Sequence, residues 1–182
     1  MERALTDQPI PLDREAVAKI FDLHYDELYR YLYGRLGHQE TAEDLTQAAF
    51  HRLVEAIGRG RGPSRNARAW LYRVARNLAV DEVRRQTLRS RHAVRDSIEA
   101  AVGVGEQAEA NIAAEGLRKA MDHLTRRQRE VIELKFVHGL TTPEVAEVLT
   151  LSKRGVLKLQ QRGLAALRTQ LMLANVREGQ TR

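Results

Sequence analysis

The chain has 182 residues, of which 43% are apolar and 30% are charged, a composition suited to one or two compact domains. It contains no cysteine, which excludes disulfides, thiolate zinc sites and cysteine nucleophiles. No apolar signal core and no run of about 18 apolar residues occurs, so we expect a cytoplasmic protein without membrane insertion. The net charge of +6 at pH 7 favours an anionic partner.

The charges are unevenly distributed along the chain. Residues 1–56 carry a net charge of −5, whereas residues 57–85, in which every basic side chain is arginine, carry +6. Residues 86–112 carry −1, and residues 113–182 carry +6 again. One acidic and two basic regions predict at least two kinds of partner.

The first half of the chain opens with two predicted helices. Asp13 can cap a helix that runs to about Leu36. Its expected buried face follows helical spacing and consists of Val17, Ile20, Phe21, His24, Leu28, Tyr31 and Leu32. Thr41 is expected to begin the second helix, because Thr41 to Asp44 resembles a capping box, and Gly58 ends that helix.

A loop, a third helix and a linker follow. Residues 58–66 contain three glycines and a proline, which predict a loop. The third helix is expected from about Ala67 to Arg85 or beyond. Its expected buried stripe consists of Trp70, Leu71, Val74, Leu78 and Val83. Residues 86–112 lose this periodicity, which indicates a linker.

The second half predicts four helices. The first is short and carries Leu117, Ala120, Met121 and Leu124. A capping box from Thr125 to Gln128 opens the next, with Val131, Leu134 and Val137 as its apolar residues. Thr141 to Glu144 open a third helix, with Pro143 at a first-turn position, and Ser152 caps a last one that reaches about Leu173.

No strand signal occurs, so the predicted fold class is all-α, with two small helical domains joined by a flexible linker. The expected bounds are 13–88 and 113–175 for the domains, 89–112 for the linker, and 1–12 and 176–182 for the tails.

The spacing in residues 142–161 is typical of a helix-turn-helix. Ala146 occupies a position where two helices cross closely, and the turn is expected at 150–152. The apolar residues that bury one side of both helices are Val145, Leu149, Leu151, Val156 and Leu159. Thr150 stands where such turns usually carry glycine, and Gly155 and Gly163 lower the helix propensity of the second helix.

The exposed side of this second helix is predicted to be basic. Residues 150–170 contain five basic side chains and no acidic one. An ordinary helical hairpin with a solvated basic face is the alternative interpretation, but the small-residue spacing and the absence of acids favour a DNA-reading helix.

Three segments in this order resemble bacterial sigma factors. Residues 42–53, AEDLTQAAFHRL, resemble their core-polymerase-binding helix, and residues 69–85, AWLYRVARNLAVDEVRR, resemble their −10-element helix. Residues 124–168 resemble their −35-reading domain. The order and the linker are similar to the small two-domain extracytoplasmic-function (ECF, group 4) type of the sigma-70 family. The two predicted domains are accordingly expected to be sigma-2-like and sigma-4-like.

The resemblance implies three contact sets. The core-polymerase-binding residues would be Glu43, Asp44, Leu45, Gln47 and Phe50. The residues at −10 DNA would be Arg59, Arg61, Arg65, Asn66, Arg73, Arg76, Asn77 and Arg84. The residues at −35 DNA would be Ser152, Lys153, Arg154, Leu157, Lys158, Gln161 and Arg162. Leu157 stands where the family commonly has lysine, which allows apolar contact with a thymine methyl group.

Several residues have a second interpretation. Asp44 is also a candidate cap of its helix, and either Leu45 or Phe50 is expected to be a packing residue. By the resemblance, the loop 58–66 lies where a flipped-out −10 base is accepted, and stacking of that base would need Trp70 or Tyr72. Trp70 is more readily explained as a core residue.

The resemblance implies a sigma factor that binds core RNA polymerase and promoter DNA, with an anti-sigma factor as a further partner. It would be nucleoid-associated when bound to polymerase. The alternative is a stand-alone helix-turn-helix regulator that does not require core polymerase. No enzyme, cofactor, metal or small-molecule substrate is expected, because no catalytic or phosphate-loop motif occurs and the histidines are scattered.

Overall fold

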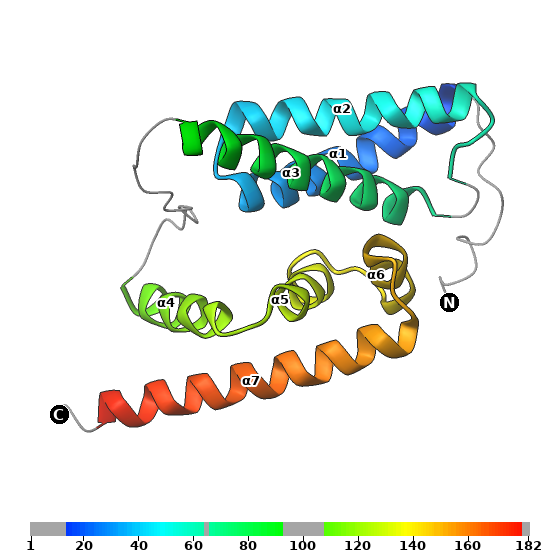
Figure 1. Ribbon diagram of the computed structural model, residues 1–182. Coiled ribbons are helices and arrows are strands. Elements are labelled where there is room, and N and C mark those ends of the chain that lie inside the picture. The colour runs from blue at the N-terminus through cyan, green and yellow to red at the C-terminus, as the bar shows by residue number, and fades with distance from the viewer. Residues whose placement is uncertain (1–13, 64–65, 93–107, 180–182) are drawn as a thin grey trace. The chain divides into compact units, whose positions relative to one another are not determined.

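The computed structural model describes residues 14–63, 66–92 and 108–179, and every regular element within these ranges is a helix (Figure 1). The chain divides into two compact units, residues 1–102 and 103–182. The all-α fold with two small helical domains is therefore confirmed. None of the described helices combines the length and apolar character needed to cross a membrane.

Three helices form the first unit: α1 (Arg14–Leu36), α2 (Gln39–Gly58) and α3 (Ala67–His92). Each of them contacts the other two. The helices form as the apolar spacing predicted. Leucines three and four residues apart lie on the same side of an α-helix. The fully buried large side chains of this core are Leu28, Leu32, Leu53, Leu71 and Tyr72.

An ion pair joins α1 to α3 beside this core. The Arg68 guanidinium donates to both carboxylate oxygens of Glu27, at 2.9 Å from Nε to Oε1 and 2.7 Å from Nη2 to Oε2. His24 lies against the same carboxylate, with 2.6 Å between Nδ1 and Oε1. Both partners of the pair are largely buried, so the bidentate geometry orients α3 on α1.

Local hydrogen bonds define the connection from α2 to α3. The Arg61 N–H donates to the Ala56 carbonyl at 2.7 Å and the Gly60 N–H donates to the Ile57 carbonyl, the pattern of a Schellman motif. Gly60 has a φ of +67°, which only glycine adopts readily. The Ala69 N–H donates to Oδ1 of Asn66 at 2.9 Å, so Asn66 caps the start of α3.

Three expectations for the first unit are wrong. Helix α2 begins at Gln39, so Thr41 and Asp44 lie inside the helix and form no capping box. Phe21 is 42% exposed, although its ring packs at a tilt against that of Phe50 with 4.9 Å between ring centroids. Val83 is 44% exposed on the part of α3 that extends past the core to His92.

Helix α3 therefore continues into the expected linker. Its last turns are held by surface interactions, such as the 3.0 Å pair between Arg85 and Glu82 and the hydrogen bond from the Thr87 hydroxyl to the Val83 carbonyl. Such interactions need no buried apolar stripe, which explains why periodicity missed these turns. Residues 93–107 of the expected linker lie outside the described residues.

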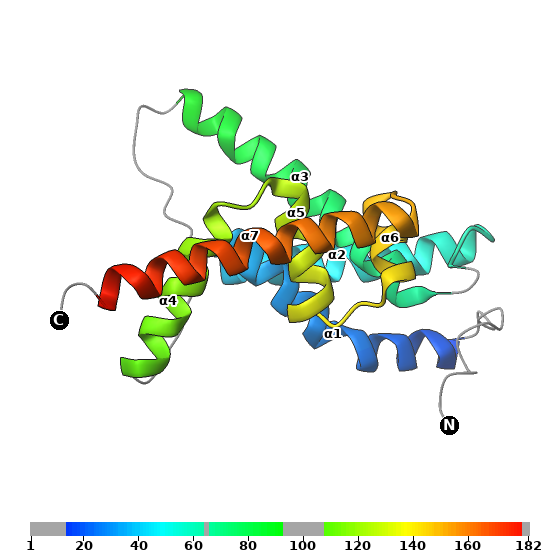
Figure 2. The same cartoon turned by 90° about the horizontal axis from the view of Figure 1, so that it is seen from below.

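The second unit contains α4 (Ala108–Asp122), α5 (Arg126–Ile132), the π-helix η1 (Glu133–Val137), α6 (Thr142–Leu149) and α7 (Lys153–Gly179). Helix α7 runs along α4, α5 and α6 and contacts all three (Figures 1 and 2). It is longer than expected, since the sequence predicted an end near Leu173. The core residues of this unit include Ala120, Leu124, Val131, Ile132, Leu134, Val145, Val156 and Leu167.

The capping box from Thr125 to Gln128 is confirmed, and a second one joins Thr141 to Glu144. Val131 and Leu134 are buried, but Val137, which follows them at helical spacing, is 70% exposed. It ends the π-helix, whose wider turn shifts the register of the residues that follow Ile132. Val137 therefore leaves the face that α-helical spacing assigns to it.

The turn between α6 and α7 contains an unusual backbone conformation. Thr150 has a φ of +54° and is the only non-glycine residue with positive φ in the described ranges. The Leu151 N–H donates to the Ala146 carbonyl at 2.8 Å, and the Thr150 N–H donates to the Glu147 carbonyl. The turn therefore closes in the manner usual for glycine, with a β-branched residue in the left-handed position.

We predict that acid weakens the first unit through Glu27. Burial raises the pKa of Glu27, but the hydrogen bonds and charges of His24 and Arg68 lower it by more. The net effect is a pKa lowered from 4.5 to about 2. Because the folded pKa lies below the unfolded one, the stabilisation is complete above pH 4.5 and is lost as the pH falls towards 2. Urea unfolding followed by Trp70 fluorescence should show the difference between wild type and Glu27→Gln shrinking over this range. A difference that stays constant with pH would contradict the assignment.

We also predict that Thr150→Gly stabilises the second unit by about 1 kcal/mol, because glycine removes the steric cost of the left-handed conformation. Hydrogen exchange of the α6 and α7 amides should slow correspondingly. Thr141→Gly is the control and should accelerate exchange, because Thr141 has a φ of −71° and its hydroxyl contributes to a capping box. Equal or faster exchange in Thr150→Gly would show that Thr150 is not strained.

Candidate nucleic-acid interface

Helices α6 and α7 form the helix-turn-helix that the sequence predicted. Val145, Val148 and Val156 are buried, and Ala146, whose backbone carbonyl accepts the Leu151 N–H in the turn, is 8% exposed. Ser152 caps α7, with the Gly155 N–H donating to its Oγ at 3.0 Å. A Cβ on Gly155 would lie 3.2 Å from that oxygen, so glycine leaves room for the cap.

Gly163 has a different role on α7. A Cβ at this position would lie 3.1 Å from Cγ1 of Ile132, closer than most real contacts of this kind. Glycine therefore allows α5 and α7 to approach closely, and its low helix propensity is offset by the packing of Ile132. Both glycines of α7 therefore stand where a side chain would crowd a neighbouring atom.

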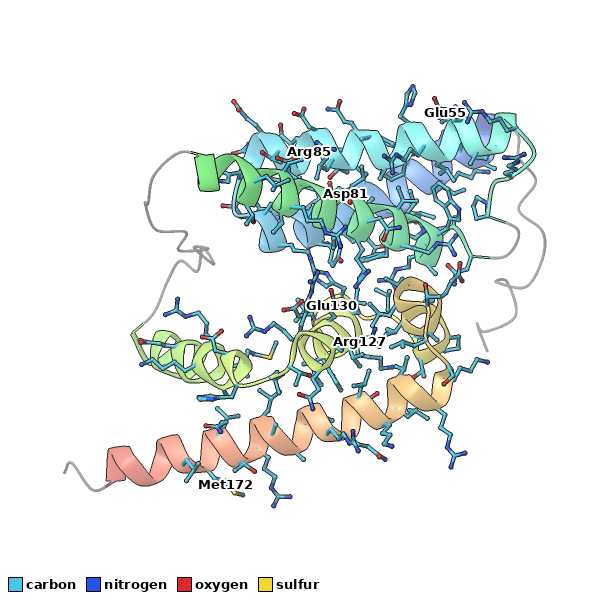
Figure 3. The ribbon with its side chains drawn as sticks, viewed as in Figure 1. Glu55, Asp81, Arg85, Arg127, Glu130 and Met172 are labelled. Atoms are coloured by element: carbon cyan, nitrogen blue, oxygen red, sulfur yellow. The ribbon has the colours of Figure 1, made fainter. Side chains whose placement is uncertain are left out.

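The side of α7 away from this core carries the predicted −35 residues. All seven are exposed: Ser152, Lys153, Arg154, Leu157, Lys158, Gln161 and Arg162. Met172, about five helical turns after Arg154, continues the same side, and Figure 3 shows it projecting away from α4, α5 and α6. From Lys153 to Met172, the helix therefore separates a packing face from an exposed face.

Several described acidic side chains of the second unit make contacts away from the exposed face of α7. Glu144 accepts from the Thr141 N–H at 2.7 Å, and Asp122 pairs with Arg129 at 3.0 Å. Glu130 is 4% exposed, and its Oε1 lies 3.8 Å from Nε of Arg126. Within the described ranges, no carboxylate pairs with the cations of the exposed face of α7. The positive charge of that face is therefore available to an anion.

The predicted −10 residues lie on α3 and on the connection that precedes it. Arg73 and Arg76 are half-buried, whereas Asn77 and Arg84 are exposed. Arg84 lies 4.0 Å from Asp81 on the surface, a contact of little energetic weight. Figure 3 shows Asp81 and Arg85 on this helix.

The residues of the connection divide by role. Arg59 and Arg61 are exposed where α2 ends. Asn66 uses its side-chain oxygen to cap α3, and Arg65 lies outside the described residues. Tyr72 is fully buried and is excluded as a base-stacking residue, whereas Trp70 is half-buried.

Two features were not predicted from the sequence. Arg68 is one of the basic residues of the segment 57–85, but its pairing with Glu27 means that it is not an exposed cation. Phe136 and Val137 are 57% and 70% exposed on η1 and form an apolar surface. No periodicity signal reveals either feature, because both depend on tertiary packing or on the π-helix.

The predicted polymerase-binding residues of α2 also divide. Asp44 and Gln47 are exposed one turn apart, and Glu43 and Leu45 are half-buried. Phe50 is 6% exposed, stacks with Tyr25 and packs at a tilt against Phe21, so it is the packing residue of the pair Leu45 and Phe50. Across the described ranges, no three histidine, aspartate or glutamate side chains converge as metal ligands.

Comparison with known proteins identifies both units. Residues 20–89 match the family Sigma-70 region 2, and residues 114–167 match the family Sigma-70, region 4. The chain is 30% identical over 168 residues to the ECF RNA polymerase sigma factor BldN of Streptomyces coelicolor, covering 85% of this chain and 60% of BldN. It is 30% identical over 174 residues to the ECF RNA polymerase sigma factor SigW of Bacillus subtilis, covering 87% of this chain and 90% of SigW.

Solved structures share the fold. The sigma factor RpoE of Bartonella quintana, in complex with the anti-sigma factor NepR, matches with a TM-score of 0.67 and 19% identity over 85% of this chain and 96% of RpoE. CnrH, in complex with the cytosolic domain of CnrY, matches with a TM-score of 0.62 and 23% identity over 88% of this chain and 90% of CnrH. The two matched regions and the identity to SigW show that the chain belongs to the ECF sigma factors of the sigma-70 family, which direct transcription.

Proposed function

We propose that this sigma factor binds core RNA polymerase through α2, contacts and helps to melt the −10 element through α3 and the connection before it, and reads the −35 element through α7. The observation that carries this proposal is the exposed face of α7, where four cations and a glutamine lie without a described carboxylate partner. Phosphates of DNA supply the missing counter-charge, and base edges supply partners for Arg154 and Gln161.

The proposal for the first unit depends on the separation of charge between its helices. Asp44 and Gln47 form an exposed polar surface on α2, and no described cation pairs with Asp44. Arg59, Arg61 and Arg84 lie on the connection and on α3. An acidic surface suits a basic surface of polymerase, whereas the arginines suit DNA. Trp70 is the remaining aromatic candidate for stacking on an unpaired −10 base.

An anti-sigma factor is a further proposed partner. RpoE and CnrH, which share this fold, were each solved in a complex, RpoE with an anti-sigma factor. Sigma factors are not enzymes. We propose that this chain is cytoplasmic and associates with the nucleoid when it is bound to polymerase. The stand-alone regulator is not favoured, because the chain has a region 2 as well as a region 4.

Asp44→Arg is expected to weaken binding to core polymerase by about 30-fold or more, because one partner of a desolvated charge pair is reversed. Size-exclusion co-elution with core enzyme measures the loss. Asp22→Arg is the matched control, since Asp22 is also an exposed aspartate but lies on α1. Co-elution of Asp44→Arg at the wild-type level would contradict the proposed role of α2.

Alanine substitutions at Arg154, Lys158 and Gln161 are expected to include at least one that relaxes specificity at the upstream element, at a cost of about 1–3 kcal/mol for the preferred base. The −10 preference should stay unchanged. Lys153→Ala should instead weaken binding to all DNA sequences alike. It should also reduce the salt dependence of binding by about one unit of slope.

Transcription from promoter variants at two salt concentrations separates these effects. If all four variants discriminate between upstream sequences as the wild type does, α7 is not the reading helix.

A further inference from the structure

Leu157 is an apolar side chain within the basic face of α7. It is 47% exposed, although the neighbouring Val156 is fully buried. It lies one turn after Arg154 and one turn before Gln161, so these three side chains occupy one side of the helix. A single exposed leucine is common on protein surfaces, but this one is surrounded by the cations proposed to contact DNA.

The packing of the second unit does not account for Leu157. The core of α7 is formed from the other side of the helix, by Val156, Gly163 and Leu167. Between Arg154 and Lys158, a leucine also adds no charge and no hydrogen bond to the exposed face. Its remaining property is an apolar surface, which needs an apolar partner to be favourable.

The major groove of DNA offers one apolar group on its base edges, the C5-methyl group of thymine. Contact of Leu157 with another base edge would cover a hydrogen-bonding group without replacing its bonds, which is unfavourable. Given the proposed reading function of α7, on which this inference rests, we propose that Leu157 selects thymine at one position of the upstream element through its methyl group.

The position of Leu157 along the helix supports this assignment. In a helix-turn-helix, the N-terminal residues of the second helix contact base edges. Leu157 lies in the second turn of α7, which begins at Lys153. Leu164 is 41% exposed on the same side but lies about 10 Å further along the helix axis. Leu164 is thus a matched control that is expected to lie beyond the base edges.

The test removes only the methyl group. Holoenzyme assembled from the full chain and core polymerase first selects its upstream element from a pool of random duplexes. Each thymine of the selected element is then replaced singly by deoxyuridine, which lacks the C5-methyl group. At one thymine, the replacement should weaken binding of the wild type about fourfold, as expected for one buried methyl-sized group. Leu157→Ala should bind both duplexes equally, whereas Leu164→Ala should retain the wild-type difference.

Other outcomes overturn the assignment. It fails if no deoxyuridine duplex weakens the wild type, if Leu157→Ala keeps the wild-type difference, or if Leu164→Ala loses it. Leu157→Lys provides a second variant and should remove the discrimination while steepening the salt dependence. If the holoenzyme selects no upstream sequence at all, the proposed reading function of α7 fails, and the role of Leu157 fails with it.

Discussion

Helix α7 has to pack on one side and stay free on the other, and the second unit depends on this division. Its packing side meets α4, α5 and α6, and the absence of a side chain at Gly163 lets Ile132 approach the helix closely. The exposed side is consequently fixed by the geometry of the helix, because residues that follow Val156 by one or two positions turn away from the core. Replacing Gly163 would disturb the core and the orientation of the basic face together. The proposed reading of DNA therefore relies on a packing contact that no nucleic acid touches.

In the first unit, an ion pair between Arg68 and Glu27 holds α3 against α1. Helix α3 carries arginines that are proposed to meet DNA, yet it is held against α1 by another arginine. Arg68 is committed to Glu27 in a bidentate, largely buried pair, which leaves residues such as Arg84 on the surface. The pKa of Glu27, lowered to about 2 by His24 and Arg68 although burial raises it, keeps that pair charged well below neutral pH. Arginine thus has two roles on α3. The largely buried Arg68 orients the helix, and exposed arginines such as Arg84 lie on its surface.

Much of this arrangement could be predicted from the sequence. Apolar spacing and the capping signals at Thr125 and Ser152 predicted the helices of the second unit and the helix-turn-helix. The errors have physical causes that lie outside local patterns. Periodicity assumes an α-helical register, which fails for Val137 at the end of a π-helix. Periodicity assigns a residue to one face of a helix but does not say how deeply that residue is buried. Phe21 lies on the predicted face and is nevertheless 42% exposed. Among the candidate site residues, Asp44 and Arg154 were correctly expected on the surface, but the burial of Phe50 and Tyr72 required tertiary packing.

The central claim is that this chain acts with core polymerase to choose where transcription starts. Run-off transcription on genomic fragments, with core polymerase freed of other sigma factors, tests it most directly. The account predicts that the full chain produces discrete transcripts whose start sites share upstream and −10 sequences, and that core enzyme alone produces none of them. A chain that binds such fragments without core polymerase, and leaves the start sites of transcription unchanged when core polymerase is added, would contradict it.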